Sequence, residues 1–269
     1  MQPRIYANRG KQIVINTIAY ELMKIIEFEE LESTNGYCGG LDLGSVEDFT
    51  TVWAHRQTVG RGQRGNRWES EGAKNLTFSV VLHPVFLPAR RQYELTKALA
   101  LGVSDWVMDE ADSKRVEIKW PNDIYAEGKK ICGILVENKI GERYETAVCG
   151  IGVNINQTEF GEGAPNATSL QLLTGREYEL RGMLESLLES LRKRYEQLAK
   201  TGQQAEGNPI DEEYMKRMMY LGEESRYVYR GETISATITG VSQWGHLQLT
   251  TNDGRKIECE IKEIVFSRQ

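Results

Sequence analysis

The sequence has few of the residues that build metal sites and disulfide frameworks. Its four cysteines form no CxxC pair, and its three histidines lie far apart along the chain. Widely separated cysteines favour reduced packing residues over a disulfide or a zinc site. No HExxH metal motif and no GxSxG nucleophile elbow occurs. The sequence therefore predicts chemistry without a protein-bound transition metal and without an activated serine.

Long apolar runs and an excess of basic residues are also missing. No window approaches the roughly 18 consecutive apolar residues of a membrane-spanning helix. The first twenty residues mix basic and polar side chains, without the apolar region of a signal peptide. The sequence thus predicts a cytoplasmic protein with no membrane partner. A formal net charge of -6 argues against DNA as the partner, because phosphate binders usually carry a basic excess.

The composition, with 40% hydrophobic and 27% charged residues, suits a soluble globular enzyme. Apolar residues at helical spacing predict one helix between residues 90 and 110 and another between 179 and 200. Strands are predicted over residues 25–31, 51–54, 76–82, 116–120, 131–136 and 146–155. Helices and strands mix without a regular βαβ alternation, which predicts the α+β class.

After about residue 220 the sequence changes character. Short β-rich runs at residues 226–229, 233–239, 246–250 and 256–261 are separated by turn signals. This pattern predicts a small barrel of roughly fifty residues. We therefore divide the chain into residues 1–220 and 221–269. Residues 1–22 are set apart as an upstream extension, because Met23 offers an alternative start.

Residues 60–68 read GRGQRGNRW and satisfy the GxGxxG dinucleotide pattern literally. A Rossmann motif must open a helix, whereas this segment leads into a strand, and no GK[ST] makes it a P-loop. Its glycines let backbone N–H groups approach an anion, and its arginines can hold phosphate or carboxylate. Trp68 offers a face to a purine. The segment is predicted to stay mobile until an anionic ligand binds; the alternative is a solvated basic loop.

Two further segments, residues 119–137 and residues 150–156, carry ligand signals. Lys130 enters an apolar strand beside a glycine, and an unpaired buried ammonium is costly, so a negative group is expected there. Asn122 and Asp123 follow a predicted strand, where they could make a turn or could present an amide to a nucleotide and a carboxylate to magnesium. Gly150 and Gly152 leave one face of their strand bare for a ligand.

In order and spacing, residues 33–35, 60–68, 119–123, 130–135 and 150–154 resemble the motifs of the biotin–protein ligases, or biotin–[acetyl-CoA-carboxylase] ligases. The resemblance covers residues 25–160 and, in character, the C-terminal segment. It implies a mixed-sheet catalytic domain, shared with lipoate ligases, and a C-terminal SH3-like β-barrel. The implied activity is ATP-dependent ligation of biotin, through biotinyl-5'-AMP, to a lysine of a biotin carboxyl carrier protein of acetyl-CoA carboxylase or a related carboxylase.

The resemblance also implies roles for individual residues. Arg61, Lys130 and Mg²⁺ would offset the charge of the reacting anions. Asp123 is a candidate both for Mg²⁺ and for accepting the carrier amine's proton. The residues implied to bind biotin are Ser33, Thr34, Asn35, Gln57, Arg61, Gly62, Gln63, Lys130, Gly133 and Gly150. Those implied to bind ATP are Gly60, Arg64, Arg67, Trp68, Asn75, Asn122 and Asn154.

Two positions depart from the family pattern. Arginine is common where Gln63 stands, so the adenylate is expected to be held less tightly unless Arg64 or Arg67 compensates. The residues after Asn35 are rich in glycine where a helix commonly follows. Only about thirty residues precede Ser33, so no repressor module and no repressor role are expected. The alternatives are a lipoate ligase and a non-catalytic biotin-binding module.

Overall fold

The computed structural model describes residues 14–18, 23–141, 144–201 and 208–267. A large sheet of eight strands has the order β1-β2-β3-β4-β8-β7-β6-β5, and the only parallel pair among these strands is β2 with β3. The strands are β1 (Val14–Ile18), β2 (Met23–Leu31), β3 (Thr50–Gln57), β4 (Leu76–Leu82), β5 (Val116–Lys119), β6 (Asp123–Ala126), β7 (Lys129–Ile140) and β8 (Tyr144–Val153).

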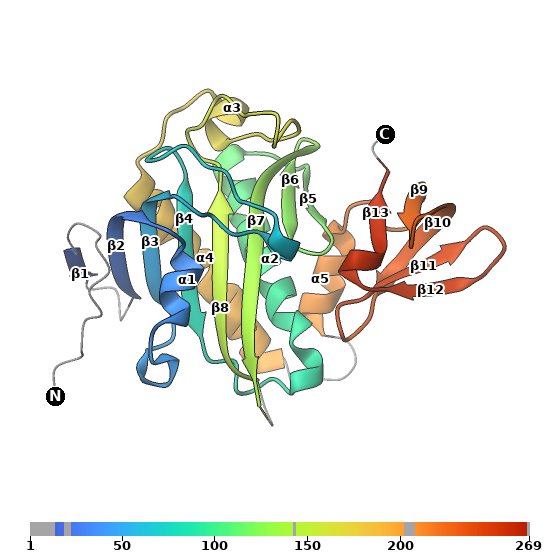
Figure 1. Cartoon of the computed structure of the whole chain (residues 1–269), viewed down its shortest axis with the longest axis horizontal. Helices are drawn as coiled ribbons and strands as arrows, with labels where there is room; N and C mark the ends of the chain where they lie inside the picture. The colour runs from blue at the N-terminus through green and yellow to red at the C-terminus, as the bar shows by residue number, and fades with distance from the viewer. Residues whose placement is uncertain (1–13, 19–22, 142–143, 202–207, 268–269) are drawn as a thin grey trace.

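Two long helices, α2 (Tyr93–Ala111) and α4 (Leu180–Thr201), cover one face of this sheet (Figure 1). The apolar stripe of α4, which includes Leu187 and Leu191, is fully buried in the main hydrophobic core. Gly102 of α2 permits the close approach of the helices, because a Cβ there would lie 3.1 Å from the Cα of Leu191. The strong apolar periodicity of both segments predicts these helices correctly.

The opposite face carries the short helix α1 (Thr34–Gly39). Its N-cap is Ser33, whose side chain accepts a hydrogen bond from the Gly36 N–H at 3.3 Å. Cys38 anchors the helix in a second apolar cluster with Phe28 and Val52. The glycine-rich segment after Asn35 therefore departs from the family pattern in composition but still forms a helix, because capping and this buried contact stabilise it.

The four cysteines are free and buried, as predicted. Burial is the main cause that raises the pKa of the Cys38 thiol to about 12, and it raises the pKa of Cys132 and of Cys149 further still. A thiol with so high a pKa is neutral at physiological pH and is a poor nucleophile. These cysteines therefore act as packing residues.

The C-terminal segment forms a separate antiparallel sheet in the order β12-β11-β10-β9-β13. Its strands are β9 (Glu224–Tyr229), β10 (Glu232–Val241), β11 (Leu247–Thr251), β12 (Lys256–Cys259) and β13 (Ile264–Phe266). The prediction of a small all-β unit is confirmed. The predicted closure into a barrel is not confirmed. The 3-10 helix Ile261–Glu263 carries the chain from β12 to the far edge of the sheet, so the edge strands β12 and β13 do not pair with each other.

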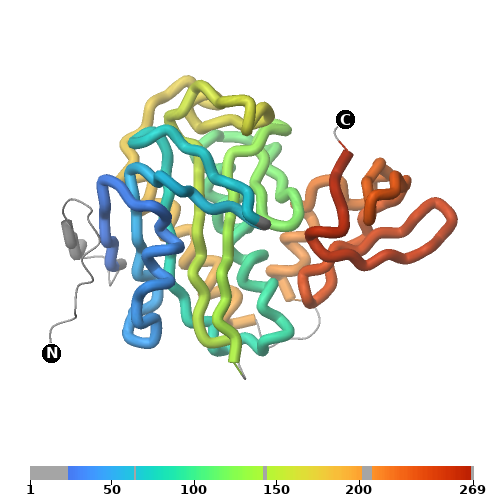
Figure 2. The backbone as a smooth tube through the Cα atoms, in the orientation of Figure 1, coloured from blue at the N-terminus to red at the C-terminus, as the bar shows by residue number. Residues whose placement is uncertain are grey.

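The small sheet lies beside the large one, with α5 (Pro209–Arg217) between them (Figures 1 and 2). Both sheets contribute to one hydrophobic core. The Trp120 indole N–H donates to the Gly245 carbonyl at 2.9 Å, and the Met219 N–H donates to the Ile118 carbonyl at 2.9 Å. A Cβ at Gly245 would lie 2.5 Å from the Tyr93 ring, so glycine permits this contact. The two sheets are thus docked by buried and specific contacts.

The Trp120 bond predicts a measurable link between the sheets. In Trp120→Phe the Gly245 carbonyl loses its buried donor, so we expect a loss of about 1–3 kcal/mol in the free energy of unfolding. Urea denaturation followed by circular dichroism measures this loss. Trp244→Phe is the matched control, because Trp244 is half exposed on the same turn. Equal stabilities for the two variants would contradict the prediction.

The α+β class and the predicted elements are confirmed, and the predicted ends of the helices and strands differ from the observed ends by at most four residues. Six short α-helices and β-strands were not predicted: β1, α1, β6, α3 (Leu170–Thr174), α5 and β13. Most of residues 1–22, which the sequence analysis set apart as an extension, lies outside the described residues. The described part of this segment is β1, which pairs antiparallel with β2. In the described part of the chain, no helix is both long and apolar enough to cross a membrane.

Candidate active site

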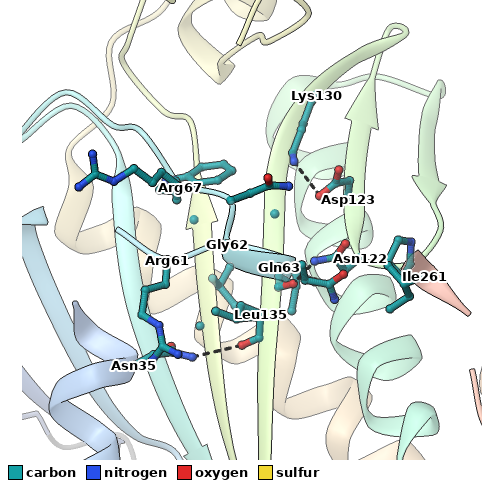
Figure 3. A pocket seen from close by; sticks show the side chains of 18 of the residues that line it. Asn35, Arg61, Gly62, Gln63, Arg67, Asn122, Asp123, Lys130, Leu135 and Ile261 are labelled. Carbon is teal, nitrogen blue, oxygen red and sulfur yellow. Dashed lines mark hydrogen bonds and ion pairs between the residues drawn. The ribbon is translucent and has the colours of Figure 1, made fainter. Parts of the chain in front are cut away.

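A cavity of about 330 Å³ opens on the face of the large sheet that carries α1 (Figure 3). Its walls come from the start of α1, the loop of residues 60–68, strands β7 and β8, and the small sheet. Most of the residues proposed from the sequence line it: Ser33, Thr34, Asn35, Gln57, Arg61, Gly62, Gln63, Arg67, Trp68, Asn122, Asp123, Lys130, Gly133 and Gly150. The fold therefore gathers five sequence-distant motifs at one place.

A polar network forms one end of the cavity. The Thr34 N–H donates to Gln57 Oε1 at 2.7 Å. The Ser79 hydroxyl lies 2.7 Å from Thr34 Oγ1 and 2.6 Å from Asn35 Oδ1. Thr34, Asn35 and Ser79 are buried, so their mutual hydrogen bonds fix the side chains and keep the remaining donors and acceptors in set directions.

The other end is marked by Lys130 and Asp123. Lys130 Nζ lies 2.8 Å from Asp123 Oδ1, across the hairpin that joins β6 to β7. The same ammonium lies 5.7 Å from the centroid of the Trp68 ring, over its face. Asp123 is the only acidic residue that lines the cavity in the described part of the chain. Lys130 is therefore held by a single carboxylate and stays accessible to an anion in the cavity.

Glycines allow two side chains to lie flat on the sheet between these ends. A Cβ at Gly152 would lie 2.3 Å from Trp68 Cε2, and one at Gly150 would lie 2.2 Å from Asn35 Oδ1. Gly133, which pairs with Gly152, would bring its Cβ to 3.0 Å from the indole. The bare strand faces expected to receive a ligand are thus covered here by Trp68 and Asn35. The Trp68 indole N–H is buried and has no hydrogen-bond partner among the described residues.

The loop of residues 60–68 crosses in front of β8 and β7 (Figure 2). Arg61 and Arg67 form an isolated antiparallel bridge, and the Gly62 N–H donates to the Asn66 carbonyl at 2.8 Å. Gly60 must be glycine, because a Cβ there would lie 2.3 Å from the Trp68 carbonyl oxygen. The loop is therefore a hairpin-like strap whose ends are fixed by backbone contacts.

Arg61 is directed toward Asn35, away from Lys130 (Figure 3). Its guanidinium makes a bidentate contact with Glu137, in which Nη2 donates to Oε1 at 2.7 Å and Nη1 donates to Oε2 at 3.3 Å. Glu137 Oε2 also accepts from Asn35 Nδ2 at 2.8 Å. Arg61 and Lys130 therefore line the same cavity, but each is paired with its own carboxylate.

Three residues proposed to bind ATP do not reach the cavity lining: Gly60, Asn75 and Asn154. The Asn75 side chain donates to Gln157 Oε1 at 2.6 Å and accepts from the Ile155 N–H at 2.9 Å. Asn154 Nδ2 donates to the Thr168 carbonyl at 2.9 Å. Both amides thus hold loops around the cavity. The Arg64 side chain lies outside the part that the structure describes.

Several residues in and around the cavity wall were missed by the sequence reasoning. Ser79 and Glu137 belong to the polar network. The only signal for Ser79 was a small polar residue within a mostly apolar strand, and Glu137 begins a polar run that gave no signal. The small sheet contributes Ile261, Ile264, Val265 and Phe266. Lys119 Nζ lies 5.2 Å from the Phe266 ring centroid. The C-terminal sheet is therefore part of the site.

No cluster of three or more His, Cys, Asp or Glu side chains suited to a metal ion occurs among the described residues. Mg²⁺ in nucleotide sites is held largely by phosphate oxygens and water, with one or two protein carboxylates. The Asp123 carboxylate lines the cavity and meets this modest demand. The residues present therefore fit a magnesium ion that arrives with a nucleotide.

Comparisons with known proteins agree with this geometry. Residues 27–154 match the model of the Biotin/lipoate A/B protein ligase family. The chain is 30% identical over 236 residues to the bifunctional ligase/repressor BirA of Bacillus subtilis, which covers 86% of this chain and 71% of that protein. It is 32% identical over 202 residues to the biotin–[acetyl-CoA-carboxylase] ligase of Paracoccus denitrificans, covering 71% of this chain and 80% of that protein.

A solved structure gives the same result for the fold. The biotin protein ligase from Aquifex aeolicus in complex with biotin and ATP superposes with a TM-score of 0.74 at 27% identity, covering 91% of this chain and 99% of that chain. The resemblance seen in the sequence is thus confirmed. The chain belongs to the biotin/lipoate A/B protein ligase family.

Proposed function

We propose that this protein joins biotin to a lysine of a biotin carboxyl carrier protein, using ATP to form biotinyl-5'-AMP first. The observation that carries the proposal is that one cavity holds a fixed amide and hydroxyl network at one end and Lys130 at the other. A molecule with a polar head, an apolar chain and a terminal carboxylate matches this layout.

The cavity suggests how each substrate is held. The cyclic urea of biotin has donors and acceptors suited to Thr34, Asn35 and Gln57. Its apolar chain would run toward Lys130 past the Trp68 indole, which covers glycines of β7 and β8. For the nucleotide we propose Arg67, Trp68 and Asn122, which line the cavity, as the contacting residues. Asn75 and Asn154 would act indirectly, by holding the surrounding loops.

In the first step a biotin carboxylate oxygen attacks the α-phosphorus of ATP, and pyrophosphate leaves. Two anions must meet, so the cations of the cavity lower the barrier by offsetting their repulsion. Lys130 supplies a directed ammonium there, and Arg61 a planar fork suited to oxyanions. Bound magnesium would add charge neutralisation at the phosphates, with Asp123 as the protein carboxylate beside it. Trp68 and the strap exclude water from the mixed anhydride.

In the second step the carrier's lysine amine attacks the acyl carbon, an amide bond forms, and AMP leaves. No nucleophile of this protein takes part, which agrees with its buried and neutral cysteines. The amine must lose a proton, and Asp123 is our candidate acceptor once Lys130 has turned to the ligand. We assign the chemistry to residues 1–220 and a supporting wall of the cavity to residues 221–269. We place the reaction in the cytoplasm, with an acetyl-CoA carboxylase or related carrier as the partner.

The test is pyrophosphate release from the full chain with ATP, Mg²⁺ and a single vitamin. We expect release with biotin, and transfer of biotin to an added carrier domain. Release with lipoate instead would assign the protein to the lipoate branch of the family. Release with neither vitamin, combined with tight biotin binding, would make it a binding module.

The position of Gln63 leads to a further prediction. Gln63 lines the cavity in the 3-10 turn Gln63–Gly65, so an arginine there would add a charge-assisted contact to the adenylate. In Gln63→Arg we expect biotinyl-AMP to escape about 3- to 10-fold more slowly. Release of radiolabelled adenylate in a chase experiment measures this rate. Gln171→Arg, on α3 and outside the cavity lining, adds the same charge as a control; equal or faster escape from Gln63→Arg would contradict the prediction.

A further inference from the structure

The contact between Arg61 and Glu137 leads out of the main cavity. Arg61 and Asn35 line that cavity, but Glu137 does not. Glu137 lines a neighbouring hollow of about 320 Å³, which Arg61 and Asn35 also border. The Arg61 backbone thus lies in the strap over the main cavity, while its guanidinium reaches into the neighbouring hollow.

The pair is weak enough to exchange. The Arg61 and Glu137 side chains are 49% and 38% exposed, and ion pairs between such groups contribute little, because solvent screens them. The bidentate geometry nevertheless gives the contact a defined direction. A multiply charged anion in the main cavity, close to Lys130, would offer Arg61 a stronger partner. Such an anion would therefore compete with Glu137 for the Arg61 guanidinium.

Glu137 has a second partner that would remain after the exchange. Its Oε2 accepts from Asn35 Nδ2 at 2.8 Å, and that amide also lies 3.5 Å from the Leu135 carbonyl. Asn35 in turn holds Ser79. Glu137 thus stays connected to the polar network when Arg61 leaves, and the network does not need Arg61 to keep its geometry.

We propose that Glu137 is a latch: in the ligand-free protein it holds the Arg61 guanidinium outside the main cavity, and an anionic ligand releases it. The inference rests on the proposed function for the identity of the anions, which are the biotin carboxylate and the ATP phosphates. Glu137 is then a positioning residue that competes with the ligand, and it sets how readily Arg61 joins the site.

The latch predicts the sign of a mutational effect. Glu137→Gln keeps an acceptor for Asn35 but removes the charge that holds Arg61, so an anion should bind more tightly. We expect a 2- to 5-fold lower dissociation constant for biotin or for ATP, since an exposed ion pair accounts for about that factor. Calorimetric titration with each ligand alone identifies which anion Arg61 joins. If Glu137 instead held Arg61 in its working position, binding would weaken.

Three comparisons isolate the effect. Glu145→Gln removes the same charge from a neighbouring surface pair with Lys139 and is expected to leave both affinities unchanged. Glu137→Asp keeps the charge, so its dissociation constants for both ligands should be close to those of the unmodified protein. In an Arg61→Ala background, Glu137→Gln should have no effect, because the latched group is absent.

Unchanged or weaker binding of both ligands to Glu137→Gln, or tighter binding that persists without Arg61, would overturn the latch. Inorganic pyrophosphate serves as a third titrant, because it tests the competition for Arg61 without any adenylate chemistry. An unmodified protein that makes no pyrophosphate from biotin and ATP would refute the proposed function. The pyrophosphate titration would still decide the latch.

Discussion

Replacing Lys130 by alanine is expected to slow biotinyl-adenylate formation by about 10²–10³-fold. The structure places the Lys130 ammonium in the cavity, 2.8 Å from Asp123 Oδ1. Its loss removes a cation from the meeting point of two anions and leaves the Asp123 carboxylate facing them. Both changes raise the barrier of the first step more than they weaken ground-state binding. The effect should therefore fall on kcat more than on KM.

Single-turnover pyrophosphate release measures this rate. Lys129→Ala is the matched control, because Lys129 is the preceding residue, is exposed and lies outside the cavity lining. A first step that runs at the unmodified rate in Lys130→Ala would remove this residue from its proposed role.

The second large effect is expected from Gly152→Ala. The new methyl group would lie within 2.3–2.7 Å of three atoms of the Trp68 indole, so the ring has to move. A displacement of about 1 Å at a residue that shapes the site can reduce the rate about 10²-fold. The cost in unfolding free energy should stay near 1–3 kcal/mol, because the strap can shift with the ring.

Two variants make the interpretation specific. Gly161→Ala adds a methyl group where no atom lies within 4 Å and should change neither rate nor stability. Adding Trp68→Phe to Gly152→Ala makes room beside the new methyl and should restore part of the lost rate. A Gly152→Ala variant that forms adenylate at the normal rate would show that catalysis does not depend on the packing of the Trp68 indole against Gly152.

The strands and long helices could be predicted where the pattern was continuous. Residues 76–82 are mostly apolar and form β4 with the predicted ends, and the stripe of α4 is buried as predicted. The elements that were missed, such as β6 and β13, have only three or four residues and depend on their sheet neighbours. Their local sequence carries too little periodicity to decide between strand and turn.

The same reasoning explains the outcome at the candidate site. Residues carried over by motif, such as Thr34 and Lys130, line the cavity because motif spacing follows backbone geometry. Asn75 and Asn154 share the same motifs but turn their amides to backbone groups, which spacing alone does not reveal. Glu137 and Phe266 were missed because their contacts join segments far apart in the chain.

The wall that β13 and its neighbours supply to the cavity has a consequence for thermal inactivation. We expect the five-stranded sheet, docked through contacts such as those of Trp120 and Tyr93, to detach as a unit before the rest unfolds, because the eight-stranded sheet and its helices supply most of the shared core. Heating would then abolish catalysis at a temperature below the main melting transition. Substrate that fills the gap between the two sheets would raise the first temperature and leave the second nearly unchanged.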